Sequence, residues 1–170
     1  MKTRRVTPML LAIVITLGLS SMTSDGAPTG APAGFDASWC GQSGYPTAHV
    51  GDTVALQTCF SNIGTTTWIK GASTEVVLGV CVCMPAPQLL ACNVQSPYAD
   101  WAVNWVSPKI YAQAASNSVT PGALSFFNYA VKVPAGTSPG DYYFTGELLH
   151  RATAIPVHPV GYYQVVHVVP

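Results

Sequence analysis

The chain has 170 residues, of which 49% are hydrophobic and only 8% are charged, and its formal net charge is zero. Because the basic residues form no stripe, the composition argues against a nucleic-acid-binding protein. From residue 28 onward the chain carries four basic and six acidic residues, and its length suits one domain. So few charges indicate that a partner covers part of the surface.

Residues 1–27 have the features of a secretory signal peptide. Lys2, Arg4 and Arg5 form a basic start, and an apolar segment follows that is too short to span a bilayer comfortably. Cleavage would leave no membrane span, which predicts a secreted or cell-surface protein. Residues 28–34 are small residues, Pro and Gly, and we expect a flexible linker there, followed by a single domain at 35–170.

Strand-like patterns recur along this domain. Apolar and polar residues alternate at 54–61, 125–133 and 142–149, and residues 162–169 are rich in β-branched and aromatic side chains. A period of two is typical of strands half-buried in antiparallel sheets, whereas residues 75–83 are apolar on both faces, as in a central strand. These segments predict an all-β fold, an antiparallel β-sandwich of about seven to eight strands.

All five cysteines lie in the predicted mature chain, and in an exported protein they favour disulfides with one cysteine left over. We expect Cys40 and Cys59 to tie the first strand to the second. Cys92 is expected to close its long loop onto Cys83 or Cys81, with Cys83 as the first choice.

The same cysteines allow a different interpretation, in which Cys81, Cys83 and Met84 bind a soft metal such as Cu(I). The four histidines are scattered and lack the spacing of a metal site, so structural disulfides are favoured and no metal or cofactor is expected. The spacing Gly-x-Ser-x-Gly occurs at 136–140, but there it belongs to a Pro- and Gly-rich turn before a strand, and not to the strand-to-helix turn on which a nucleophilic serine is placed. His150 follows Glu147 by three residues, which places the two on opposite faces of a strand, and no enzyme activity is predicted.

Three stretches of sequence resemble one known family. They are Gly-Asp-Thr-Val at 51–54, Phe-Ser-Asn-Ile-Gly-Thr-Thr-Thr-Trp at 60–68, and Val-Pro-Ala-Gly-Thr-Ser-Pro-Gly-Asp-Tyr at 133–142. Together they resemble the four-tryptophan (FW) immunoglobulin-like domain of autophagy cargo receptors and exported bacterial proteins. The resemblance implies an immunoglobulin-like β-sandwich that makes protein contacts and has no catalytic residues.

The tryptophans match the FW pattern only in part. Trp68 matches the family's tryptophan after the Asn-x-Gly turn, and Trp101 or Trp105 is the candidate for a middle one. The chain has Thr58 and Gly146 where the family places its other tryptophans. Trp39 lies outside the pattern.

The predicted binding surface is the long loop at 84–100 together with Trp101. Long loops in compact domains are often functional, and exposed aromatic rings anchor partners. We therefore predict that Tyr98, Asp100 and Trp101 bind a ligand, and that Trp68 and Trp105 are core aromatic residues. The predicted function is a secreted, non-catalytic binding or scaffolding module for an unknown extracellular protein. The alternatives are a carbohydrate-binding module, with Trp101 and Trp105 exposed, and a soft-metal-binding export protein.

Overall fold

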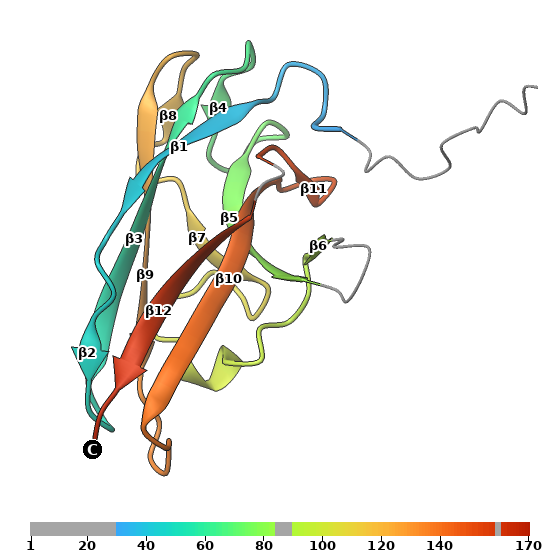
Figure 1. The fold of residues 1–170 in the computed structure, drawn as a ribbon. Helices are drawn as coiled ribbons and strands as arrows, with labels where there is room; N and C mark the ends of the chain where they lie inside the picture. Colours follow the sequence, from blue (N-terminus) through green and yellow to red (C-terminus); the bar gives the residue numbers. More distant parts are fainter. Residues whose placement is uncertain (1–29, 84–89, 159–160) are drawn as a thin grey trace, which may run out of the picture.

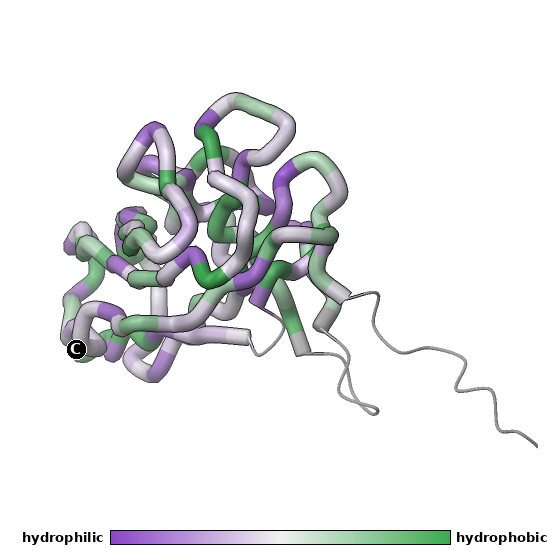
Figure 2. The backbone as a smooth tube through the Cα atoms, turned by 90° about the horizontal axis from the view of Figure 1, so that it is seen from above, coloured by the Kyte–Doolittle hydropathy of each residue, from purple (hydrophilic) through white to green (hydrophobic). Residues whose placement is uncertain are grey.

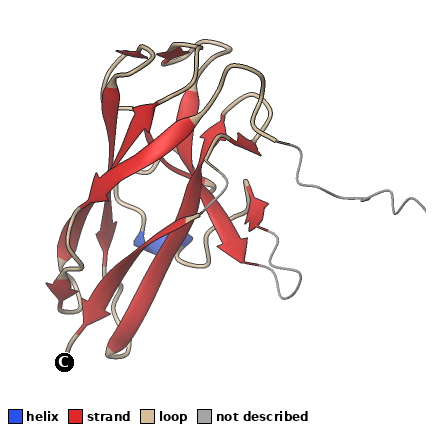
Figure 3. Ribbon diagram, turned by 45° about the horizontal axis from the view of Figure 1, so that its top comes forward, coloured by secondary structure: helices blue, strands red, loops and turns tan. Residues whose placement is uncertain are grey.

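The computed structural model describes residues 30–83, 90–158 and 161–170. The predicted signal peptide and residues 84–89 of the predicted binding loop lie outside the described residues. The regular structure is almost entirely β-strand, with one short 3-10 turn, η1, at Ala99–Trp101 (Figure 3). The all-β prediction is confirmed. Within the three described ranges, no helix is long and apolar enough to cross a membrane.

The first sheet has three antiparallel strands in the order β1-β3-β9. Its centre is β3 (Thr53–Asn62), which pairs along its length with β9 (Leu124–Lys132), while β1 (Ala37–Gln42) forms an edge. The predicted alternation is confirmed here, since Leu56 and Phe60 are buried and the odd-numbered residues of β9 from 125 to 131 are buried as well. Hydrophobic and hydrophilic residues interleave along the backbone in Figure 2.

The second sheet is built on β10 (Gly140–His150), which pairs with β12 (Tyr162–Val168) on one side and β5 (Val76–Cys83) on the other. Residues 76–81 are all buried, as predicted for a central strand. The shorter strands are β2 (Thr47–Ala48), parallel to β12; β6 (Leu90–Cys92) and β7 (Ile110–Gln113), which pair with β5; β11 (Ile155–Pro156), which pairs with β10; and β4 (Trp68–Ile69) with β8 (Ser118–Val119), which pair with each other.

The two main sheets lie face to face and enclose one core (Figure 1). The core draws on both sheets, with Phe60 and Phe127 from the first and Leu78, Phe144 and Val166 from the second. A smaller apolar cluster lies on the opposite face of β5, where the segment that carries β6 and β7 covers it. This covering explains why β5 is buried on both faces.

Two disulfides join neighbouring strands. One links Cys40 on β1 to Cys59 on β3, the pairing expected from the sequence. The other links Cys81 on β5 to Cys92 on β6, so the preferred choice of Cys83 as the partner of Cys92 was wrong. The register explains the outcome, because Cys81 lies directly opposite Cys92, whereas Cys83 lies opposite Leu90.

The soft-metal interpretation of the same segment also requires a correction. Soft metals are bound by thiolates, and the sulfur of Cys81 is taken up in the disulfide with Cys92. Among the described residues, no group of three or more His, Cys, Asp or Glu side chains is arranged to hold a metal ion.

Candidate binding site

The structure contradicts the prediction that Trp101 is an exposed binding residue. Its side chain lies in η1 and is only 3% exposed. The indole ring packs 4.7 Å from the ring of Tyr142 and 5.7 Å from that of Phe144, both on β10. The 3-10 turn directs the ring inward, where it fills the core near one end of the molecule. Trp101 therefore belongs to the interior.

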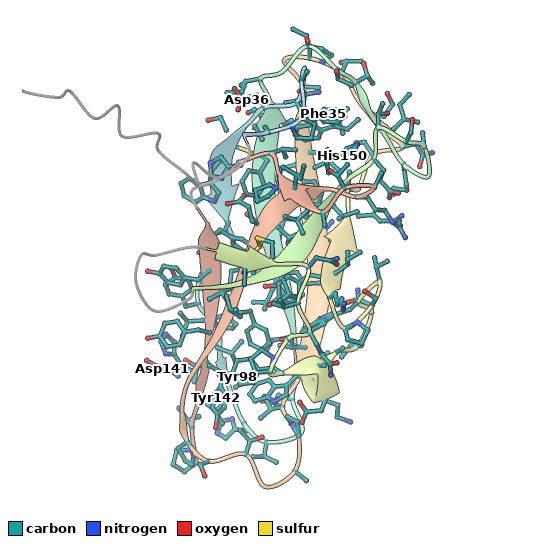
Figure 4. All side chains as sticks on the ribbon, turned by 90° about the vertical axis from the view of Figure 1, so that its right-hand side faces the viewer. Phe35, Asp36, Tyr98, Asp141, Tyr142 and His150 are labelled. Atoms are coloured by element: carbon teal, nitrogen blue, oxygen red, sulfur yellow. A yellow bond between two sulfur atoms is a disulfide. The ribbon has the colours of Figure 1, made fainter. Side chains whose placement is uncertain are left out.

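The other two predicted binding residues flank Trp101 but do not form a surface with it. Tyr98 is half-buried, and its ring lies 5.7 Å from both Trp101 and Tyr142. Figure 4 labels Tyr98 close to Tyr142, near the end of the molecule opposite to Phe35 and His150. Asp100 is exposed. We call Tyr98, Trp101, Tyr142 and Phe144 the inner aromatic cluster.

The two predicted core aromatic residues behave differently. Trp68 is almost fully buried, as expected. Trp105 is half-buried and packs against the core, with its ring 4.6 Å from that of Tyr111, and its Nε1 donates a hydrogen bond of 3.0 Å to the carbonyl of Ala130. With Trp101 buried and Trp105 bound to the backbone, these two rings do not provide the paired exposed platform that the carbohydrate alternative required.

At one margin of the two sheets, β1 and β12 lie near each other (Figure 1). Exposed aromatic rings gather at this margin. Trp39 and Tyr163 are each 50% exposed, Tyr143 is 49% exposed and Tyr45 is 43% exposed. The ring centroids of Tyr45 and Tyr163 lie 6.0 Å apart with only 25° between their planes, and Tyr143 lies 6.0 Å from Tyr163. We call Trp39, Tyr45, Tyr143 and Tyr163 the aromatic edge.

A β-bulge in β1 places Trp39 and Gln42 on the same face of the strand. Trp39 pairs with the buried Phe60 and Gln42 with the buried Thr58, so both side chains are turned toward the second sheet. On a regular strand, the side chains of residues three apart point to opposite faces. The bulge between Trp39 and Gly41 inserts one extra residue, so Trp39 and Gln42 point to the same face. Gly41 has a φ of 149°, which a residue without a Cβ adopts readily.

The second sheet contributes the tyrosines. Tyr162 points inward on β12 and is buried, so its neighbour Tyr163 points outward. Tyr143 lies on the same outer face of β10, opposite Val165. Tyr45 comes from the segment between β1 and β2, and its ring packs against Tyr163.

A hollow of about 420 Å³ opens beside these rings. Its lining includes aromatic rings from both sides and two polar side chains: Trp39, Gln42, Tyr45, His158, Tyr162 and Tyr163. The amide Nε2 of Gln42 donates a hydrogen bond of 3.1 Å to the carbonyl of Tyr163 and so connects the two walls. No serine, threonine or cysteine among the described residues lines the hollow.

A buried ion pair lies behind the hollow. Glu147 is fully buried, and its Oε1 lies 3.1 Å from Nδ1 of His158, while the backbone N–H groups of Leu148 and Gly161 donate to the same carboxylate. These donors satisfy a charge that would otherwise be costly to bury. Nε2 of His158 has no hydrogen-bond partner among the described residues.

Electrostatics keep this site close to neutral overall. The hydrogen bond to Glu147 raises the pKa of His158, and the negative charge of Asp36 acts in the same direction, whereas burial opposes them. A hydrogen bond to Tyr163 raises the pKa of Tyr45, and burial raises the pKa of Tyr162. The phenols therefore remain uncharged at neutral pH, and the charge of a protonated His158 is balanced by Glu147.

Sequence reasoning missed this site because its residues come from separate segments. The exposure of Tyr163 follows from the period of two once Tyr162 is assigned to the core. The position of Trp39 depends on a bulge and an edge strand, and the pairing of Glu147 with His158 depends on the course of the chain after β10. Neither feature produces a recognisable residue spacing in the sequence.

The chain matches no protein-family model and no curated protein. One solved structure that aligns with it is described as AvmM, which catalyzes macrocyclization in alchivemycin A biosynthesis. The alignment covers 82% of this chain and 91% of that chain, with 8% sequence identity and a TM-score of 0.39. A likeness at this level carries no argument about the fold or the activity of this protein.

Proposed function

We propose that the two sheets form an immunoglobulin-like β-sandwich. The order β1-β3-β9 corresponds to strands A, B and E of that fold, and the order β12-β10-β5 corresponds to G, F and C. Tyr142, at the start of β10, donates a hydrogen bond of 2.8 Å from its hydroxyl to the carbonyl of Ser138. This bond has the geometry of the tyrosine corner of immunoglobulin-like domains and supports the assignment.

We further propose that the chain is a divergent relative of the FW domains. The two departures from the tryptophan pattern have local reasons. The hydroxyl of Thr58 donates to the carbonyl of Gly41 in the bulge of β1. A Cβ at Gly146 would lie 2.5 Å from the carbonyl oxygen of Gly79 and 2.7 Å from the ring of Tyr162, so the tyrosines occupy the space that a tryptophan would need.

For function, we propose a secreted, non-catalytic binding module whose ligand surface is the aromatic edge. The observation that carries this proposal is the gathering of four half-exposed tyrosine and tryptophan rings at one margin. Such rings are enriched at binding hot spots, and none of the four is needed to fill the core. Both ligand classes predicted from the sequence, an extracellular protein and a polysaccharide, would use rings of this kind.

Secretion remains part of the proposal. Two disulfides fit an oxidising, extracellular environment. The sequence pattern of residues 1–27 supports export, and N-terminal sequencing of the protein recovered from culture medium or the cell surface would locate the cleavage. Recovery only of an uncleaved intracellular chain would contradict it.

Crosslinking at a single position tests the binding surface. A photo-reactive phenylalanine analogue at Tyr143 should capture a ligand on the surface of the producing cells, and an excess of unlabelled protein should suppress the capture. The matched control places the same analogue at Phe126, which is also exposed but lies on the first sheet. Equal capture from both positions would contradict the proposal.

A further inference from the structure

We propose that the hollow beside the aromatic edge binds a neutral sugar ring, as one unit of an extracellular glycan. This inference rests on the proposed function, because it names the ligand of the same surface. It differs from the sequence-based carbohydrate hypothesis in its residues, since Trp101 and Trp105 take no part.

The size and walls of the hollow suit a small ring. Ligand pockets in proteins usually range from about 300 to 1,000 Å³, and a hollow of about 420 Å³ lies toward the lower end. Its aromatic walls offer ring faces that carry partial negative charge, which attract the weakly positive C–H face of a sugar. Trp39 provides the largest of these faces and is half-exposed without any ligand.

The charges around the hollow favour an uncharged ligand. Among the described residues, no lysine or arginine lines it, and the histidine that does, His158, is already paired with Glu147. In the part of the lining that the structure describes, a carboxylated or sulfated ligand would find no free positive charge, and a cationic ligand would find no exposed carboxylate. A neutral ligand needs no charged partner in the hollow.

The polar groups of the hollow can form hydrogen bonds with the hydroxyl groups of a sugar. Nδ1 of His158 is held by Glu147, which leaves Nε2 available to a ligand. Nε2 accepts a hydrogen bond when the ring is neutral and donates one when it is protonated. A hydroxyl group can hydrogen-bond to Nε2 in both the neutral and the protonated form of the ring, because a hydroxyl group is both donor and acceptor. The amide oxygen of Gln42, which has no hydrogen-bond partner among the described residues, adds a second acceptor.

The experiment uses the full chain, expressed for export, in affinity electrophoresis through gels that contain one polysaccharide each. The neutral probes are amylose, a β-1,3-glucan and a galactomannan, and the charged probes are polygalacturonate and heparin. We expect retardation by at least one neutral probe, unchanged within about twofold when salt rises from about 0.05 to 0.5 M. We expect Trp39→Ala to weaken the affinity roughly tenfold or more and Phe126→Ala to leave it unchanged.

His158→Gln provides a second readout, because glutamine retains a hydrogen-bonding group but cannot be protonated. We expect weaker affinity than in the wild type, with the melting temperature reported alongside so that a loss of folding is recognised. Retardation by charged probes alone, or by no probe, would overturn the inference. If crosslinking at Tyr143 still captures a protein in that case, the proposed binding surface stands and only the sugar is wrong.

Discussion

The aromatic edge and the inner aromatic cluster contain the same kinds of side chain but differ in what surrounds them. Trp101 of the inner cluster has rings on several sides and is 3% exposed, whereas Trp39 of the aromatic edge is 50% exposed. Both tryptophans lie on short or edge elements, β1 and η1. The difference arises because η1 turns its ring toward β10, while β1 is the edge strand of its sheet among the described residues and leaves Trp39 half-exposed.

This contrast shows that aromatic density along the sequence does not identify a binding surface. Tyr98, Trp101, Trp105 and Tyr111 are close in sequence, yet Trp101 and Tyr111 are buried within the core, and Tyr98 and Trp105 pack against it. The aromatic edge draws single residues from four separate segments. Binding is expected where the fold leaves rings uncovered, and stability where it covers them.

The largest expected effect concerns the inner cluster. Trp101→Ala should lower the free energy of unfolding by about 3–5 kcal/mol, because it removes a buried ring and leaves a cavity. Trp39→Ala should lower it by less than about 1 kcal/mol, since half of that side chain is already in water. Urea denaturation of the two variants measures both values, and equal losses would remove the distinction between the two regions.

The disulfide between β1 and β3 anchors the strand that carries Trp39. Removing it by Cys40→Ala/Cys59→Ala should lower the free energy of unfolding by about 3 kcal/mol, as expected for a bridge that closes a loop of this length. The matched control is Cys81→Ala/Cys92→Ala, which should cost a similar amount but leave the aromatic edge intact. Loss of ligand binding in the control alone would contradict our assignment of the site.

The buried pair behind the hollow predicts a dependence on pH. Because the pKa of His158 is higher in the folded chain than its ordinary 6.5, the stability that it contributes is complete below that pH and is lost as the pH rises through the folded value. Glu147→Gln should remove this pH-dependent part and lower stability near pH 6 by about 1–3 kcal/mol. Thermal melts of both proteins from acidic to alkaline pH provide the measurement, and parallel curves would contradict the account.

A smaller loss of stability is expected at Gly146, which packs against the rings of Tyr162 and Tyr111. Gly146→Ala should destabilise by about 1–3 kcal/mol, because the new methyl group would collide with the carbonyl of Gly79, which cannot move aside freely. Gly44→Ala serves as the control, since nothing lies within 4 Å of a Cβ there. If Gly146→Ala left the free energy of unfolding unchanged, the core around Gly146 would be less tightly packed than the structure indicates.

Much of the fold could be predicted from the sequence, because a period of two reports directly which face of a strand is buried. The patterns at 54–61 and 125–133 correspond to β3 and β9, and the apolar segment at 75–83 corresponds to β5. Glu147 shows the limit of this reasoning. Its place on a polar face predicts exposure, but the chain after β10 folds over it and supplies His158 as its partner.

The candidate site could not be predicted because it depends on contacts between distant segments. The pairing of Cys92 with Cys81 instead of Cys83 depends on a register that two cysteines on one strand leave open. The burial of Trp101 depends on a three-residue turn, and the exposure of Trp39 depends on the position of β1 at the edge of its sheet. Each of these features is determined by tertiary structure, and the composition and residue spacing of the sequence do not reveal it.

The central claim is that the aromatic edge, and not the inner cluster, binds the ligand. Its most direct test is the binding of fluorescently labelled protein to the surface of the producing cells, with wild type compared with Trp39→Ala/Tyr163→Ala and with Tyr98→Phe/Asp100→Ala. We expect the first variant to bind roughly tenfold more weakly and the second to bind within about twofold of wild type, with both folded. The reverse order would contradict the account.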